Sequence, residues 1–186
     1  MTNPRFLTPI LAIGALAGIQ LSQAVVYRGI DFPDGPVSFA DAVVSYDPLF
    51  DGGPAPTHPN FTDPDEALGV PDYSGGGTGT GSVSLGDGGR IVLEFIDNFL
   101  TGSDDAGFDL HIFEVGPDVE DTFVDISKDG SFWYSVGKVT GGISSIDIDS
   151  FGFTSADLFS FVRLTDDTLL DGQTGTTVGA DIDAVG

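Results

Sequence analysis

Short runs of strand-forming residues, separated by turn residues, cover most of this chain of 186 residues. After residue 25 there is almost no helical periodicity, and runs rich in Val, Ile, Phe and Tyr alternate with Gly, Asp and Pro. The clearest predicted strands are Arg90–Ile96, Phe108–Val115, Thr122–Ser127, Phe132–Val139, Ser145–Ile148, Phe159–Thr165 and Ala180–Val185, with weaker ones at Ala42–Tyr46 and Ser82–Leu85. The pattern predicts an all-β fold of about eight strands, an antiparallel β-sandwich jelly roll.

Residues 1–24 have the features of a secretory signal peptide. Arg5 provides the positive charge, residues 10–21 are apolar, and Ser22 and Ala24 place small side chains at the −3 and −1 positions of a cleavage site. A membrane anchor or an N-terminal helix is the alternative, but about a dozen apolar residues are too few to span a bilayer. We therefore expect an exported protein, extracellular or on a bacterial cell surface, with no membrane insertion and a single domain over residues 25–186.

The charge of the chain is strongly one-sided. It contains 29 Asp and Glu against 6 Lys and Arg, for a formal net charge of −23, and no Cys. Scattered cations cannot form the basic patch that a nucleic acid requires, so a nucleic-acid partner is excluded. Because nearly all the acids are Asp, which favours turns and oxygen-rich metal sites over helices, the composition also directs attention to cations.

Three groups of acids are close together in turn-rich sequence. They are Asp63, Asp65 and Glu66; Asp104, Asp105 and Asp109; and Asp181 and Asp183. Calcium takes six to eight oxygen ligands, which irregular loops supply easily, and clustered carboxylates repel one another unless a cation lies between them. We expect a structural calcium ion in at least one group. The alternative is that all these acids are solvated turn residues.

The standard calcium-binding loop fails a direct comparison. Asp147, Asp149 and Gly152 match its opening and its sixth-position glycine, but Phe151 stands where Asp or Asn belongs and Leu158 replaces the twelfth-position Glu. This segment is therefore predicted to be a strand edge and not an EF-hand.

Signals for catalysis are weak, so we expect a protein that is not an enzyme. The sequence contains no nucleophile elbow, phosphate-binding loop or dinucleotide fingerprint, and His58 and His111 are more often structural than catalytic in such settings. A carboxylate-pair hydrolase stays as a minor alternative, because abundant acids make that signal uninformative.

Glu114 and Arg163 are charged residues that share strand faces with apolar side chains. Glu114 alternates with Phe108, Leu110 and Ile112, while Arg163 follows Phe159 and Phe161 at the same spacing. A buried ion pair between Glu114 and Arg163 would satisfy both charges. The alternative is that Glu114 lies at a strand end and reaches water or a metal.

Two sets of motifs resemble known families. Residues 123–133 with Val136-Gly137, followed by residues 161–165, resemble the strand–turn–strand hairpin and the next strand of discoidin-type domains. In order along the chain, residues 67–72, 83–89, 109–116 and 179–185 are similar to exported bacterial cell-surface domains, some of which bear a PEP-CTERM sorting tail.

The resemblance implies a galactose-binding-like β-sandwich with a structural calcium ion. In such folds the cation commonly joins an early loop to the last strand, which would bring Asp63, Asp65 or Glu66 to Asp181 or Asp183. The resemblance fixes architecture better than activity.

Two functions are compatible with these features. The first is a calcium-stabilised, non-catalytic module for carbohydrate or extracellular matrix, in which Tyr73, Trp133 and Tyr134 stack on sugar rings. The alternative for Trp133 is a core position in its hairpin. The second function is a homo-oligomer, a self-assembling surface layer, filament or matrix with calcium-dependent contacts.

Overall fold

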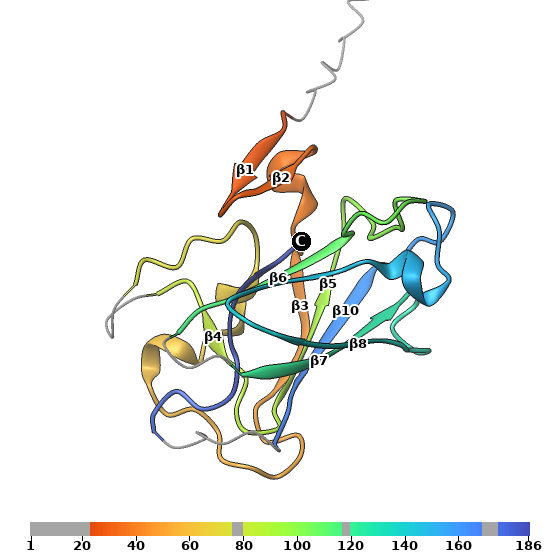
Figure 1. The fold of residues 1–186 in the computed structure, drawn as a ribbon. Coiled ribbons are helices and arrows are strands. Elements are labelled where there is room, and N and C mark those ends of the chain that lie inside the picture. The colour runs from red at the N-terminus through yellow and green to blue at the C-terminus, as the bar shows by residue number, and fades with distance from the viewer. Residues whose placement is uncertain (1–22, 76–79, 117–119, 169–174) are drawn as a thin grey trace, which may run out of the picture.

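The computed structural model describes residues 23–75, 80–116, 120–168 and 175–186, which form an all-β structure (Figure 1). Eleven strands lie in antiparallel sheets within this part of the chain. The larger sheet has the order β3 (Ala42–Asp47), β5 (Arg90–Glu94), β10 (Phe161–Asp166), β7 (Asp121–Ser127) and β8 (Tyr134–Thr140). The second has the order β4 (Val83–Ser84), β11 (Asp181–Val185), β6 (Leu110–Glu114) and β9 (Ile143–Ile146), while β1 (Val25–Tyr27) pairs with β2 (Ile30–Phe32).

One apolar core joins the two larger sheets, which gives the fold its β-sandwich-like architecture. Strands β5 and β10 contribute Leu93 and Leu164, and β6 and β11 of the other sheet contribute Ile112 and Ile182 to the same cluster. Each of these side chains is almost completely buried. Because successive residues of a strand point to opposite faces, their neighbours along the five-stranded sheet face outward.

The outward face of the five-stranded sheet carries charged residues in register. Arg163 of β10 lies opposite Asp125 of β7 and Val92 of β5, and Thr165 lies opposite Arg90. Side chains directly opposite one another on one face are the closest cross-strand neighbours. This register places two arginines on a small area of the sheet.

The turn between β7 and β8 has the predicted hairpin form. Asp129 Oδ1 accepts hydrogen bonds from the backbone N–H groups of Ser131 at 2.8 Å and Phe132 at 3.0 Å. Gly130 has a φ of 72°, a left-handed conformation that glycine adopts without steric cost. The Asp-Gly sequence therefore fixes the position of Trp133 just beyond the turn.

All nine predicted strands are present, with ends that differ by at most two residues, and the sequence pattern did not predict β1 and β2. These two strands have three residues each, which is too short for a periodic signal. They pack through Phe32 in a second apolar cluster that includes Phe39, Phe113 and Ala184. The backbone of Gly186 and that of His111 exchange two hydrogen bonds next to this cluster.

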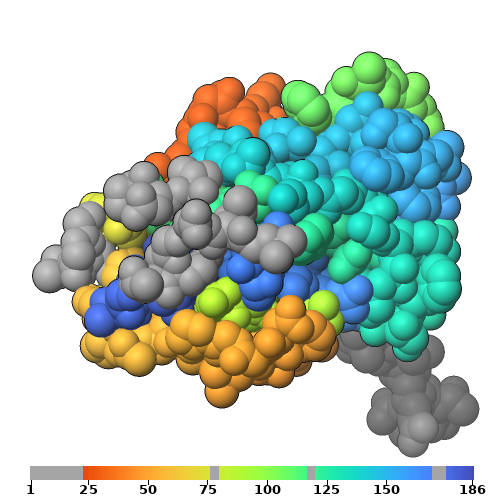
Figure 2. Space-filling model, turned by 60° about the horizontal axis from the view of Figure 1, so that its bottom comes forward, coloured from red at the N-terminus to blue at the C-terminus, as the bar shows by residue number. Residues whose placement is uncertain are grey.

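Four short 3₁₀ helices, η1 (Gly35–Ser38), η2 (Pro59–Phe61), η3 (Pro64–Ala67) and η4 (Ile148–Phe151), interrupt the connections. The β3–β4 connection lies beside the segment before β11, as Figure 2 shows, and the N–H groups of Thr57 and His58 both donate to the carbonyl of Thr176. At the other end of the sheets, the β5–β6 and β9–β10 connections lie together (Figure 1).

No helix in the described ranges has the length and apolar character needed to cross a membrane. The predicted signal peptide, residues 1–24, lies outside the described residues except for its last two positions.

Candidate functional site

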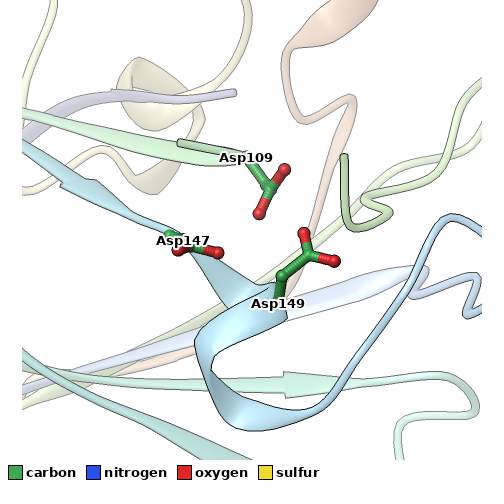
Figure 3. Close-up of side chains that lie close together, drawn as sticks. All are labelled: Asp109, Asp147 and Asp149. Atoms are coloured by element: carbon green, nitrogen blue, oxygen red, sulfur yellow. The ribbon is translucent and has the colours of Figure 1, made fainter. Parts of the chain in front are cut away.

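Three carboxylates converge where the β5–β6 and β9–β10 connections meet. Asp109 immediately precedes β6, Asp147 is the N-cap residue of η4, and Asp149 lies within η4. One oxygen from each lies within 4.8 Å of the others, and Figure 3 shows the three side chains pointing toward one another. All three residues are partly buried.

Hydrogen bonds hold these carboxylates in place. Asp149 accepts from the N–H groups of Ser103 at 2.8 Å and Asp104 at 3.2 Å, so it fixes the β5–β6 connection to η4. Asp109 Oδ2 accepts from the N–H of Ile148 at 2.9 Å. The carboxylates are therefore preorganised by backbone donors, and each retains oxygen lone pairs for a further partner.

The electrostatic environment of the three acids favours a cation. None of them forms an ion pair with Lys or Arg among the residues that the structure describes. Burial raises the pKa of Asp109, and the neighbouring carboxylates of Asp149 and Asp147 raise it further. Three half-buried carboxylates on irregular backbone form a donor set that suits calcium.

The structure brings only one residue of the second predicted acid group into this site, namely Asp109. The Asp104 carboxylate accepts from the hydroxyl of Ser155 and from its N–H at 3.0 Å, and these two bonds, the hydroxyl first, lower the pKa of Asp104. The Asp105 carboxylate accepts from the N–H of Gly107 at 2.6 Å. Asp104 thus links the β5–β6 connection to the β9–β10 connection, Asp105 completes an exposed turn, and neither belongs to the three-carboxylate group that contains Asp109.

The sequence does not single out Asp147 and Asp149 as candidate ligands, because their segment departs from the EF-hand pattern. The signal that could have found them is the Asp-x-Asp spacing directly after a strand. Sequence alone could not show that this pair meets Asp109, since the contact depends on β6 pairing with β9.

The first predicted acid group is positioned by a helix cap. Asp63 Oδ1 accepts from the N–H of Asp65 at 3.2 Å at the start of η3, and both residues are exposed. Helix η3 lies beside β11. The resemblance to discoidin-type folds likewise implied that an early loop lies close to the last strand. However, among the described residues no carboxylate from residues 63–66 joins Asp181 or Asp183 in a three-ligand group.

Asp181, which is partly buried, and Asp183, which is completely buried, instead have separate partners. Asp183 Oδ1 accepts from the N–H groups of Asp72 at 2.9 Å and Tyr73 at 3.1 Å, and its Oδ2 pairs with Arg28 at 3.2 Å. Asp181 accepts from the hydroxyl of Ser84, and burial raises the pKa of Asp181 to about 6. These contacts tie β11 to its surroundings without a metal.

The expected ion pair between Glu114 and Arg163 is wrong. Arg163 donates from Nε at 3.0 Å and Nη2 at 2.8 Å to Asp125, its in-register neighbour on the outward face of the five-stranded sheet. Glu114 belongs to the other sheet, is buried, and accepts from the N–H of Glu120 at 3.0 Å. Burial and a shared hydrogen bond with the Glu120 carboxyl raise the pKa of Glu114 to about 9.

The three aromatic residues predicted to bind ligand occupy different environments. Tyr134 packs edge-on against Phe153 and Phe159, with ring centroids 5.2 and 6.0 Å away. Tyr73 is half-buried next to Phe61. Trp133 is half-buried, with the guanidinium carbon of Arg163 4.3 Å from the centre of its ring.

Trp133 borders a groove on the outward face of the five-stranded sheet, with a volume of about 380 Å³. Strands β3, β5 and β10 and the β7–β8 turn contribute to it. Its lining is Val44, Ser45, Asp47, Phe50, Arg90, Val92, Gly130, Trp133, Phe161 and Arg163. Aromatic rings, guanidinium groups, a carboxylate and a hydroxyl thus share one open surface.

A second hollow of about 350 Å³ lies beside the three carboxylates. Asp109 is part of its wall, together with His111 and the exposed rings of Phe99 and Phe108. It provides a second position at which a ligand could meet aromatic side chains.

No family model matches the sequence, and neither a curated protein nor a solved structure is similar to it by sequence or fold. The fold and its sites therefore define an all-β, sandwich-like protein with an acidic three-carboxylate site and an aromatic–arginine groove, and its function is inferred from these features.

Proposed function

We propose that this chain is an exported, non-catalytic carbohydrate-binding domain with a galactose-binding-like jelly-roll fold, as its resemblance to discoidin-type domains implies, and that calcium stabilises it. The observation that carries the proposal is the groove beside Trp133. It combines an indole ring and two phenyl rings with hydrogen-bonding groups on a rigid sheet.

These groups suit the chemistry of a sugar. The apolar face of a pyranose packs on aromatic rings, while its hydroxyl groups need both donors and acceptors. The groove supplies donors from Arg90 and Arg163, and acceptors from Asp47 and Ser45. Because all four project from paired strands, their spacing is set before a ligand arrives.

In this proposal calcium is structural. Asp109, Asp147 and Asp149 would hold the ion where the β5–β6 connection meets η4. A cation there would relieve repulsion among the three carboxylates and hold the two connections together. None of the three carboxylates lines the groove, so the contribution of the ion would be to rigidity and not to ligand contact.

The experiment is a glycan-binding screen of the purified protein in calcium buffer, repeated with Trp133→Ala and Phe108→Ala. Each substitution removes one partly exposed aromatic ring, Trp133 from the groove and Phe108 from the second hollow. We expect binding by the native protein and by Phe108→Ala, and a loss of at least about tenfold with Trp133→Ala.

Loss of binding with Phe108→Ala alone would move the site to the second hollow, and absence of glycan binding by the native protein would contradict the proposal. Light scattering on the same samples tests self-assembly, the alternative function. A calcium-dependent increase in mass without any glycan binding would favour that alternative.

A further inference from the structure

Arg90 is exceptional among the cations of this acidic chain. Arg28, Lys128, Lys138 and Arg163 each form an ion pair with a carboxylate, whereas Arg90 forms none within the described ranges. In a chain with 29 acids and 6 Lys and Arg, a cation without a carboxylate partner is unexpected. Arg90 is therefore held by contacts other than an ion pair.

The Arg90 side chain is held in place without neutralisation. Its Nε donates to Thr165 Oγ1 at 2.9 Å, and its guanidinium carbon lies 3.5 Å from the centre of the Phe50 ring. No hydrogen bond joins its terminal nitrogens to another described residue, and Arg90 is one of the residues that line the groove. Stacking on an aromatic ring orients a guanidinium and leaves its in-plane donors available.

The nearest acids do not complete the pairing. Asp47 lies opposite Arg90 in register, but its Oδ1 accepts from the N–H of Leu49 at 3.1 Å. Burial and the nearby Arg163 lower the pKa of Arg90, although the carboxylates of Asp125, Asp51 and Asp47 act in the opposite direction. The groove therefore holds two positively charged guanidinium groups. Arg163 is paired with Asp125, whereas Arg90 has no ion-pair partner among the described residues.

The two arginines are diagonal neighbours on adjacent strands. Arg90 lies opposite Thr165, and Arg163 is two residues from Thr165 on the same face of β10. Such diagonal positions place side chains roughly 7–8 Å apart at their bases, within reach of long side chains. A carboxylate between them would accept from Arg90 and from the Arg163 nitrogen that does not bond to Asp125.

We propose that the groove selects glycans that carry a carboxylate, such as uronic acid units, with Arg90 as the residue that recognises the carboxylate and Trp133 as the stacking platform. This inference rests on the proposed carbohydrate-binding function. The planar guanidinium favours a carboxylate because the two groups match as parallel hydrogen-bond forks. The high net negative charge makes this local pairing essential, because the rest of the surface repels an anionic chain.

The test compares two probes that differ only at the carboxylate, namely a short oligogalacturonate and its fully methyl-esterified form. Calorimetric titration of the full chain at constant calcium and ionic strength gives both affinities. We expect the acid to bind about tenfold more tightly than the ester, a difference of about 1.4 kcal/mol. Arg90→Gln should remove that preference, because it should weaken binding of the acid about tenfold more than binding of the ester.

Lys138→Gln is the matched control, because it removes the same charge from strand β8, outside the groove. We expect it to keep the tenfold preference, which would exclude a general effect of net charge. Equal binding of acid and ester by the native protein would overturn this inference and leave carbohydrate binding intact. A preference that Arg90→Gln leaves unchanged would also overturn it. Failure of the glycan screen, in contrast, would contradict the proposed function itself.

Discussion

Arg28 and Asp183 form an ion pair at 3.2 Å between residues that are 155 positions apart in the chain. The side chain of Asp183 is completely buried, whereas that of Arg28 is 41% exposed. The same carboxylate accepts from two backbone N–H groups, so it joins the β1–β2 turn and the segment before residue 75 to strand β11. Asp183 therefore has a structural role in joining these segments.

We expect Asp183→Ala to lower the free energy of unfolding by roughly 2–4 kcal/mol, because it leaves two N–H donors and Arg28 without their acceptor. Urea denaturation monitored by tryptophan fluorescence measures the change. Asp97→Ala removes an exposed acid whose side chain forms no hydrogen bond among the described residues, and it should cost less than about 0.5 kcal/mol. Equal effects of the two substitutions would contradict a structural role for Asp183.

Stability should fall as the pH rises from mildly acidic to alkaline values. Glu114 is buried next to Glu120 and Asp181, and its pKa is raised from 4.5 to about 9. The folded state therefore keeps a proton that the unfolded chain releases above pH 4.5. The contribution of Glu114 to the free energy of unfolding is thus fully present below pH 4.5 and decreases steadily as the pH rises to about 9. The raised pKa of Asp181 adds a loss between about pH 4 and 6.

Glu114→Gln should make the stability less sensitive to pH, because a neutral amide replaces a carboxyl that must ionise. The increase in the free energy of unfolding that the substitution causes should be larger at pH 8 than at pH 5 by at least about 1 kcal/mol. Thermal unfolding at both pH values, in chelator, measures the difference. A native protein that is more stable at pH 8 than at pH 5 would contradict this account of Glu114.

Calcium should raise the melting temperature through the three-carboxylate site. At about one hundred times the dissociation constant, a ligand bound only by the folded state adds roughly 2.7 kcal/mol, which corresponds to about 5–10 °C for a domain of this size. Asp149→Asn should abolish the calcium-dependent increment, and Asp63→Asn should preserve it, because Asp63 caps η3 far from Asp109 and Asp147. A melting temperature that does not respond to calcium or to chelator would exclude this site.

Gly89 should not tolerate a side chain. A Cβ atom at Gly89 would lie 1.7 Å from the carbonyl oxygen of Leu85, whereas one at Gly142 would lie 3.4 Å from its nearest neighbour. We expect Gly89→Ala to destabilise the fold by more than about 3 kcal/mol and Gly142→Ala by less than about 1 kcal/mol. Gly89 directly precedes β5, which begins at Arg90. Chemical denaturation of both variants measures the change in the free energy of unfolding. A small effect at Gly89 would show that the turn can rearrange.

The strands were largely predictable because alternation and turn residues are local signals. The Asp129-Gly130 turn and the buried positions of β5 and β10 follow directly from them. Strands β1 and β2 were not predictable, since their stability comes from packing of Phe32 against Phe39 and Phe113 and not from their own sequences.

The sites were predictable only in part, because they depend on which strands pair. Alternation placed Arg163 with Phe161 on one face but could not say that this face points outward, where Asp125 is in register. In the same way, Asp109 was a candidate ligand from its own segment, but its meeting with Asp147 and Asp149 required the pairing of β6 with β9. Residues 63–66 looked equally suitable because a cap and a metal ligand use the same acids.

Strand β11 lies between β4 and β6, although residue 114 ends β6 and residue 181 begins β11. A nascent chain that stops before residue 181 contains β4 and β6 but lacks β11, the strand that pairs with both. The four-stranded sheet therefore closes only after synthesis has reached residue 185, and pairing over such a sequence distance is slow to form. Until that point the four-stranded side of the apolar core is incomplete, whereas all five strands of the larger sheet have already been made.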